Sequence, residues 1–422
     1  MKRFLLFLLF ALLAFSVNAV DKKEKPKPVP TVKSLLKDAR QSIKNKRDQA
    51  RHEQTLQEAL KREGLSNADK AEIRHMQAML NISINDAENL KAYLKQKYDT
   101  AAYFNTLLKA SEYALQSDSL DALPDEKGRQ KFVLRSKNRE ILLKNRSNIY
   151  NGGRFFLRKN DYSKALPYFV SFLKMRQASM LENEVSVQQD GLYPTVSMYA
   201  MVCSYNCKMP QKALTFIDEA MNGVASDKLP ILQEYKVRCY SAIHDTANWV
   251  TELHKGCKLY PNHDYFFTSL LDFYESSKSY DEGISLCDSI LHNVGDKPLY
   301  YYAKSLMYLH KEQWQDCIDM CDSTLCRDSL NANAHYNRGI SYVNLAMELE
   351  ESVNNLRNKS KQRKEQAAIL DLYRKARPSF ETLRQLLPDD QRRWAPPLYR
   401  IYLNLNCGKE FEEMEQILKT LK

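Results

Sequence analysis

The sequence predicts an all-α fold built from repeated helical hairpins, and three observations support this prediction. Glycine is scarce, at 11 of 422 residues, and charged residues make up 27% of the chain. Long stretches place apolar residues at helical spacing, while few runs are rich in β-branched residues. Similar sets of small and aromatic residues return with a period of about 34 residues in the second half. A chain of this length can form one such array because each unit packs only on its neighbours.

The first nineteen residues have the layout of a secretory signal peptide. Lys2 and Arg3 precede an apolar run from Phe4 to Phe15, and small side chains at Val17 and Ala19 complete a cleavage motif. We therefore expect a signal peptide over residues 1–19 and a mature chain that begins at Val20.

The segment after the predicted cleavage site, residues 20–32, is rich in Lys and Pro and predicts a flexible linker. The apolar run of the leader is too short for a permanent membrane span, and no later stretch approaches that length. The first cysteine is Cys203, so we expect no lipid anchor at the start of the mature chain. The expected location is the periplasm.

The repeat is clearest in one helix pair, which contains Gly153, Phe156, Tyr162, Ala165, Phe169 and Phe172. We expect Gly153 on the first helix to face Ala165 on the second, so that the two helices approach closely. Phe156 and Phe169 are expected to fill the space beside this contact. The same register predicts further units around Ala213, Trp249, Gly283, Cys317 and Ala376, and a weaker last unit over residues 398–421.

A helix–turn–helix period of about 34 residues with small and aromatic residues in fixed positions resembles the tetratricopeptide repeat. The resemblance covers residues 148–422 and implies a solenoid of helical hairpins wound as a right-handed superhelix. Ala376 lies well beyond one period after Cys317, and the excess equals the length of the segment 345–369. We therefore expect a helical extension near 345–369, formed by two overlong helices with a charged tip.

Three stretches are similar to a family of secreted tetratricopeptide proteins from the Bacteroidota, which has no assigned activity. They are KAYLKQKYDT (Lys91 to Thr100), YNGGRFF (Tyr150 to Phe156) and LYRIYLNLNCGKEFEEM (Leu398 to Met414). This similarity implies the fold and the exported location, and it implies no function.

The N-terminal part, residues 33–147, predicts degenerate helical repeats. One of its helices is expected to begin at Pro124 and to carry a basic surface, which lies within the region 129–159. Counting Lys and Arg against Asp and Glu, residues 20–160 carry +12 and residues 161–422 carry −3. The basic half suits an acidic partner such as a phosphate-bearing glycolipid or a nucleic acid, or it is a solvated helix surface. We do not expect nucleic acid as the partner.

The nine cysteines first suggest disulfides in an exported protein. Cys287, Cys317 and Cys321, however, occupy positions on the second helices where small apolar residues belong. A metal site would use Cys317, Cys321 and Cys326, or Cys203 and Cys207, but paired short spacings typical of zinc are missing. We expect buried core cysteines, one disulfide at most, and no metal or other cofactor.

No residue pattern indicates catalysis. The eight histidines are scattered, no nucleophile motif occurs, and the Gly152-Gly153 pair is not followed by the Lys-Ser or Lys-Thr of a phosphate loop. We expect that the protein is not an enzyme, and an unrecognised catalytic site is the alternative.

Binding residues are predicted on the first helix of each pair, which lines the concave groove in this fold. Tyrosines recur one turn before the small position, and arginines follow it. Since Tyr and Arg often anchor interfaces, the candidate partner-binding residues are Tyr150, Arg154, Arg238, Tyr265, Tyr302, Tyr336 and Tyr399. The alternative is that these tyrosines pack within and between repeats.

The predicted function is therefore a non-catalytic, exported interaction scaffold that binds a protein or peptide in the groove. A glycan-binding protein of the cell envelope is the alternative, because groove tyrosines also suit sugar stacking.

Overall fold

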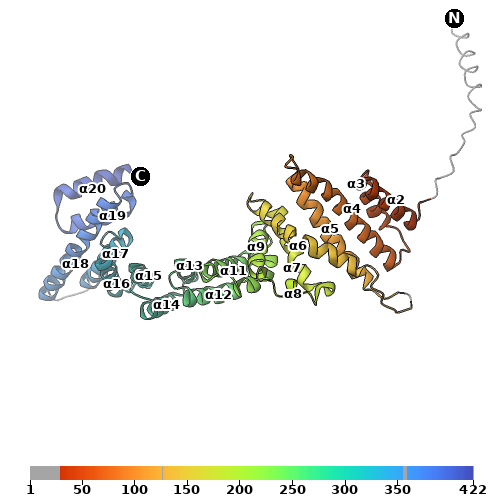
Figure 1. The fold of residues 1–422 in the computed structure, drawn as a ribbon. Helices are drawn as coiled ribbons and strands as arrows, with labels where there is room; N and C mark the ends of the chain where they lie inside the picture. The colour runs from red at the N-terminus through yellow and green to blue at the C-terminus, as the bar shows by residue number, and fades with distance from the viewer. Residues whose placement is uncertain (1–28, 126, 355–358, 422) are drawn as a thin grey trace, which may run out of the picture. The chain divides into compact units, whose positions relative to one another are not determined.

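The computed structural model describes residues 29–125, 127–354 and 359–421, and over this part of the chain it contains nineteen α-helices and no strand. The predicted signal peptide lies outside the described residues, as does most of the predicted linker. No helix in the described ranges is both long and apolar enough to cross a membrane. The chain divides into two compact units, unit 1 up to Gly223 and unit 2 from Val224 (Figure 1).

Unit 1 is a series of antiparallel helices that begins at Val32, within the predicted linker 20–32. It contains α2 (Val32–Asn45), α3 (Gln49–Ala59), α4 (Asn67–Tyr93), α5 (Thr100–Asp121), α6 (Arg135–Leu157), α7 (Tyr162–Gln177), α8 (Val185–Gln188), α9 (Tyr193–Asn206) and α10 (Pro210–Met221), with a 3-10 turn at Ser179–Leu181. Residue 147, where the degenerate repeats were expected to end, lies inside α6.

Unit 2 continues the hairpins with a more regular period. It contains a 3-10 turn at Ser226–Lys228, then α11 (Leu229–Ala242), α12 (Thr246–Leu259), α13 (Asp264–Ser276), α14 (Tyr280–Asn293), α15 (Pro298–His310), α16 (Trp314–Arg327), α17 (Ala332–Asn354), α18 (Lys359–Leu386), α19 (Gln391–Asn404) and α20 (Gly408–Thr420). We call the first helix of each hairpin helix A and the second helix B.

The turns of several hairpins in the described part of the chain share one backbone geometry. Lys278 and Glu312 adopt a left-handed conformation, with φ of 58° and 57°, and lie one repeat period apart. The next backbone N–H reaches back to the last turn of helix A, as from Gln313 to the carbonyl of Tyr308 at 3.0 Å. This arrangement satisfies carbonyl groups that a helix end otherwise leaves unpaired. The repeated turn confirms the predicted repeat period and the all-α hairpin fold.

The glycine of helix A receives an aromatic ring from helix B. A Cβ atom on Gly153 would lie 2.6 Å from the ring of Phe169, and one on Gly339 would lie 2.6 Å from the ring of Phe380. The ring of Phe169 therefore fills the space that Gly153 leaves on helix A.

Different residue pairs occupy these two positions along the chain. The A and B residues are Gly153 and Phe169, Met201 and Ile217, Val237 and Leu253, Leu271 and Cys287, Ser305 and Cys321, and Gly339 and Phe380. All of these side chains are buried. Phenylalanine on helix B stands opposite glycine in two pairs, and Cys287 stands opposite the larger Leu271, whereas Ser305 and Cys321 are both small and Met201 and Ile217 are both large.

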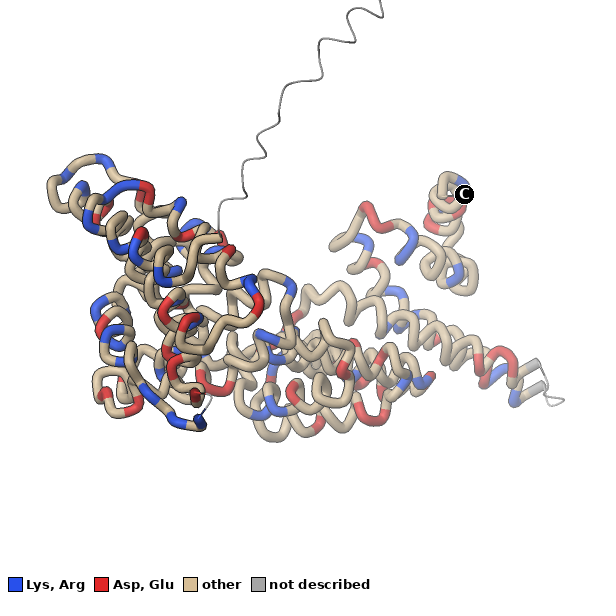
Figure 2. The backbone as a smooth tube through the Cα atoms, turned by 90° about the vertical axis from the view of Figure 1, so that its right-hand side faces the viewer, with Lys and Arg blue, Asp and Glu red and all other residues tan. Residues whose placement is uncertain are grey.

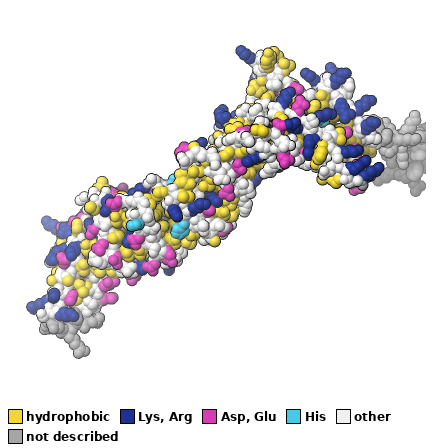
Figure 3. Space-filling model, turned by 60° about the horizontal axis from the view of Figure 1, so that its bottom comes forward, with side chains coloured by type: hydrophobic (Ala, Val, Ile, Leu, Met, Phe, Trp, Pro, Cys, Tyr) yellow, Lys and Arg dark blue, Asp and Glu magenta, His cyan; other side chains and the backbone are white. Residues whose placement is uncertain are grey.

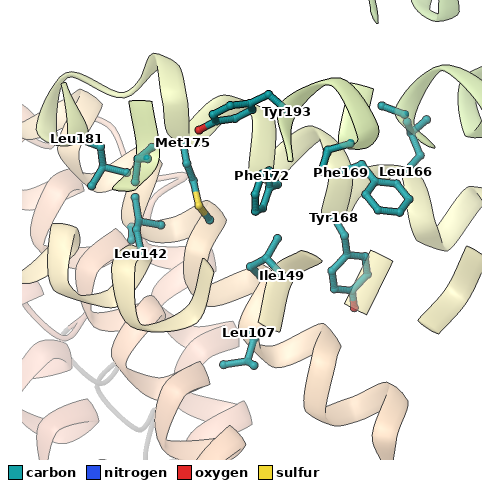
Figure 4. Packing of buried hydrophobic residues seen from close by; sticks show 14 of the residues in the cluster. Leu107, Leu142, Ile149, Leu166, Tyr168, Phe169, Phe172, Met175, Leu181 and Tyr193 are labelled. Atoms are coloured by element: carbon teal, nitrogen blue, oxygen red, sulfur yellow. The ribbon is translucent and has the colours of Figure 1, made fainter. Parts of the chain in front are cut away.

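The core of unit 1 passes from helix to helix. Figure 4 shows Phe172 of α7 next to Ile149 of α6, with Leu107 of α5 beyond it. These side chains belong to one buried cluster that includes Phe169 and Met175. The apolar side chains of α6 thus pack against both α5 and α7.

Two expectations for the irregular segments have different outcomes. No helix begins at Pro124, since α6 begins at Arg135 and the Asp121 carboxylate accepts a hydrogen bond from the Leu134 N–H at 2.8 Å. At the expected extension near 345–369, α17 and α18 have 23 and 28 residues, and the connection at 355–358 lies outside the described residues.

Candidate protein-interaction surface

The predicted tyrosines lie on A helices in both units. Tyr150 and Arg154 belong to α6 in unit 1, while Arg238, Tyr265, Tyr302 and Tyr336 lie on successive A helices of unit 2, from α11 to α17. All the tyrosines among them are half-buried. Each ring therefore packs on its own unit along one side and faces outward along the other.

An arginine lies over three of these rings. The guanidinium carbon is 5.5 Å from the ring centre for Arg154 on Tyr150, and 4.9 Å for Arg238 on Tyr265. Arg393 of α19, which the sequence did not single out, lies 4.7 Å from the ring centre of Tyr336. Attraction between a guanidinium and the negative face of an aromatic ring favours this placement. The recurring feature of this surface is thus an arginine stacked on a tyrosine.

The α11 end of this surface also carries a carboxylate. Glu234 accepts from Arg238 at 2.6 Å through one oxygen and contacts the His263 ring at 2.7 Å through the other. Arg238 is therefore already paired in this structure, while its ring contact with Tyr265 is kept.

Tyr302 lies between charges of both signs. Burial raises the pKa of the Tyr302 hydroxyl, the nearby Arg393 charge lowers it, and Glu275 raises it. Arg393 thus acts on Tyr302 of α15 as well as on Tyr336 of α17. Its Nη2 donates to the Asn333 side chain at 2.9 Å, which fixes the position of the guanidinium.

Tyr399 does not share the position of the other tyrosines. Asn406 has φ of 56°, and the Cys407 N–H bonds to the Tyr402 carbonyl at 2.9 Å, which fixes the register of this last hairpin. In that register Tyr399 occupies the place of Gly153 and Gly339. Its ring lies 4.7 Å from that of Phe411, so Tyr399 packs between the helices of its own hairpin.

Packing accounts for part of the other tyrosines as well. The Tyr150 ring lies 6.0 Å from Phe172, and the Tyr336 ring meets the Phe380 ring edge-on at 6.2 Å. These contacts anchor the rings to the core of each repeat. Because these contacts hold one edge of the Tyr150 and Tyr336 rings, each ring has a fixed orientation. Arg154 lies over the face of Tyr150, and Arg393 lies over the face of Tyr336.

Three arginines of the basic region 129–159 are tied to other parts of unit 1. Arg135 binds Asp118 at 2.9 Å, and Arg139 forms an ion pair with Glu184. Arg146 pairs with Asp190 and donates to the Tyr193 hydroxyl at 3.1 Å. The last two pairs hold the connection between α7 and α9 against α6. They are structural contacts and do not form part of an open basic face (Figure 2 shows the Lys and Arg residues of unit 1).

A groove of about 600 Å³ on the A helices α2, α4 and α6 of unit 1 was missed by the sequence analysis. Its lining is partly apolar and also contains Lys137, Lys144, Glu72 and Glu140. The lining includes Ile43, Met76, Met79, Ile82 and Ile141. The i, i+3, i+6 spacing of Met76, Met79 and Ile82 on α4 is the sequence signal that could have indicated it.

Six of the nine cysteines are buried, as expected for core positions, and all nine are free. Burial raises the pKa of the Cys203 and Cys287 thiols to about 12 and that of Cys239 to about 11. Cys326 is exposed, and Cys207 and Cys407 are half-buried. Within the described ranges no three His, Cys, Asp or Glu side chains are grouped to hold a metal ion.

Thiol labelling of the native protein near pH 8 is expected to be fast only at Cys207, Cys326 and Cys407. The other thiols are enclosed, and burial raises the pKa of Cys203, Cys239, Cys257 and Cys287, so these four stay protonated, while the thiolate is the reactive form. The hydrogen bond with Cys321 lowers the pKa of Cys317, so this thiol is expected to be slow because it is enclosed. The number of protein thiols that react with Ellman's reagent is measured over time, before and after unfolding in urea, and this measurement checks the expectation. Rapid reaction of five or more thiols in the native protein would contradict it.

No protein-family model matches the sequence, and no curated protein matches it. Among solved structures, the C-terminal part of a TPR repeat-containing protein from Cytophaga hutchinsonii is 12% identical, with a TM-score of 0.40 over 63% of this chain and 92% of that one. A TPR repeats protein from Bacteroides fragilis is 15% identical, with a TM-score of 0.31 over 66% and 99%. A monomeric mutant of IFIT1 with Gppp-AAAA is 12% identical, with a TM-score of 0.35 over 88% and 73%.

All three TM-scores are below 0.5, so the fold assignment rests on the chain's own hairpins. These combine left-handed turn residues that recur every 34 residues at His244, Lys278 and Glu312 with a helix-A glycine that packs on a helix-B phenylalanine in two repeats. By these features the protein has an all-α repeat fold of tetratricopeptide type.

Proposed function

We propose that the protein is an exported, non-catalytic scaffold that binds a protein or peptide partner on the helix-A surface of unit 2. This surface consists of Arg238, Tyr265, Tyr302, Tyr336 and Arg393. The observation that supports the proposal is the stacking of Arg238 and Arg393 on tyrosine rings of neighbouring A helices. Arginine and tyrosine at fixed positions are the side chains that most often dominate protein interfaces.

The stacked arginines favour a peptide over a neutral sugar. A sugar ring would stack on a bare aromatic face, and here a guanidinium already lies over Tyr265 and Tyr336. The Arg393 guanidinium, held over the Tyr336 ring, can donate from its edge to a carboxylate, whereas Arg238 already pairs with Glu234. We therefore propose a peptide segment with acidic side chains as the ligand.

The proposed location is the periplasm. The leader over residues 1–19 and the lack of a cysteine after Ala19 support it. The partner is accordingly expected among envelope proteins.

The double variant Tyr302→Ala/Arg393→Gln tests the surface. Capture of envelope proteins by the immobilised chain, quantified by mass spectrometry, is expected to fall at least about tenfold for the specific partner, or about 1.4 kcal/mol. The loss follows because both substitutions remove contacts on this surface.

The chain offers a matched control. Arg327 of α16 lies 4.2 Å from the ring centre of Tyr301 of α15, so Tyr301→Ala/Arg327→Gln removes the same two side-chain types outside the five residues that define the helix-A surface. Equal capture by both double variants and the unchanged chain, with unchanged melting temperatures, would contradict the proposal. A sugar ligand would be favoured instead if the unchanged chain captured no protein but bound a glycan array, and the Tyr302→Ala/Arg393→Gln variant lost that glycan binding.

A further inference from the structure

The turn between α4 and α5 exposes four large apolar side chains within a short stretch of chain. The exposed fractions of Leu90, Tyr93, Leu94 and Tyr98 are 53%, 84%, 52% and 38%. Single exposed apolar residues are normal on a protein surface, but a group this dense marks a contact site. We call these four residues together with Lys91, Lys95 and Lys97 the tip.

The backbone of the tip is ordered by its own hydrogen bonds. Lys95 adopts a left-handed conformation with φ of 56°, and the Gln96 N–H bonds to the Lys91 carbonyl at 2.9 Å. The Asp99 carboxylate accepts from the N–H groups of Ala101 and Ala102, each at 2.9 Å. The apolar side chains are therefore held in solvent by a defined turn.

The acidic and basic side chains around the tip differ in how they are paired. Glu88 binds Lys91 at 2.5 Å and also accepts from the Asp99 N–H at 2.9 Å. Lys95 and Lys97 have no ion pair within the described part of the chain. Two of the three lysines are thus available to a negatively charged surface.

We propose that the tip docks on the interface of a lipid bilayer that contains anionic lipids. Tyrosine and leucine side chains partition into the region between headgroups and acyl chains, and lysines keep their charged ends at the phosphates. Each lysine near an anionic surface adds attraction that salt screens. The four apolar and three basic side chains of the tip match the two layers of such an interface.

The position of the turn suits a bilayer more than a peptide. It closes the ends of two long antiparallel helices, α4 with 27 residues and α5 with 22 (Figure 1). Hydrophobic side chains gather on this projecting end, at the top of Figure 3, with Lys and Arg beside them. A projecting end enters a soft interface, whereas a peptide needs a groove to be enclosed.

The test uses the chain that begins at Val20, because the apolar run of the leader would itself enter lipid. This chain keeps every described residue. Flotation with phosphatidylcholine vesicles, with and without phosphatidylglycerol, is expected to show binding that increases with phosphatidylglycerol and decreases with added salt. Tyr93→Ser/Leu94→Ser is expected to lower the partition coefficient at least tenfold, and Lys95→Gln/Lys97→Gln to remove the preference for the anionic lipid.

Val185→Ser and Leu330→Ser are the controls, since these apolar side chains are 66% and 69% exposed and lie outside the tip. They are expected to bind like the unchanged chain. Absence of vesicle binding, or equal binding by Tyr93→Ser/Leu94→Ser, overturns the proposal. Sedimentation velocity that shows a dimer lost in that variant, without vesicle binding, assigns the tip to self-association instead. All tip variants keep the helix-A surface of unit 2, so the capture experiment remains independent.

Discussion

Gly153→Val is expected to lower the free energy of unfolding by about 3 kcal/mol, because the added side chain must enter the space of the Phe169 ring. The Cβ alone would lie 2.6 Å from a ring carbon, and overpacking of a close-packed seam forces shifts of side chains and backbone. Urea unfolding followed by circular dichroism measures the change.

A second substitution is expected to recover much of this loss. Gly153→Val/Phe169→Leu reproduces the pair Val237 and Leu253, which occupies the same two positions in unit 2. The double variant should be more stable than Gly153→Val alone, although Phe169→Leu by itself should destabilise by leaving a void next to glycine. A double variant less stable than both single variants would show that the two positions are not matched in size.

Asp190→Asn is expected to lower the free energy of unfolding by about 2 kcal/mol, because it leaves the Arg146 charge enclosed without its carboxylate. The side chains of Arg146 and Asp190 are only 13% and 16% exposed, and the Arg146 guanidinium carbon lies 4.0 Å from the Phe172 ring centre. Limited proteolysis should in addition cut faster within residues 178–192, the segment that Asp190 holds against α6.

An exposed ion pair provides the comparison. Glu415 and Lys419 are 43% and 59% exposed, and removal of such a pair is expected to change stability by less than about 1 kcal/mol. If Asp190→Asn is as mild as Glu415→Gln and leaves the proteolysis rate unchanged, Arg146 and Asp190 do not hold the segment.

The sequence was sufficient for the hairpins because their determinants are local. The spacing of Tyr274 and Tyr308, one period apart at the ends of their A helices, could be recognised directly, and so could the excess length between Cys317 and Ala376. The start of α6 could not, because the Leu134 N–H is bonded by Asp121, thirteen positions earlier and across a turn.

The candidate surface was predicted less completely, since its contacts join residues distant in sequence. Arg393 lies on Tyr336 from a helix 57 positions away in the chain, and Arg146 meets Asp190 over 44 positions. Spacing identifies which residues share a helix face, but it does not identify the partner each side chain finds. Tyr399 was placed in the wrong register. The prediction required a small residue three positions after the tyrosine, but that residue is Tyr402, and Tyr399 itself occupies the position of Gly153.

The long hairpin of α17 and α18 has a mechanical consequence. Arg400 of α19 donates to the Tyr373 hydroxyl at 3.0 Å and to Glu350 at 3.1 Å, while the Tyr373 hydroxyl donates to Glu350 at 2.9 Å. Two helices that extend beyond their neighbours are thereby braced against the next repeat, above the seam where Phe380 rests on Gly339. A displacement of the hairpin at Glu350 or Tyr373 relative to α19 would have to break these hydrogen bonds, so this part of the hairpin is tied to the next repeat.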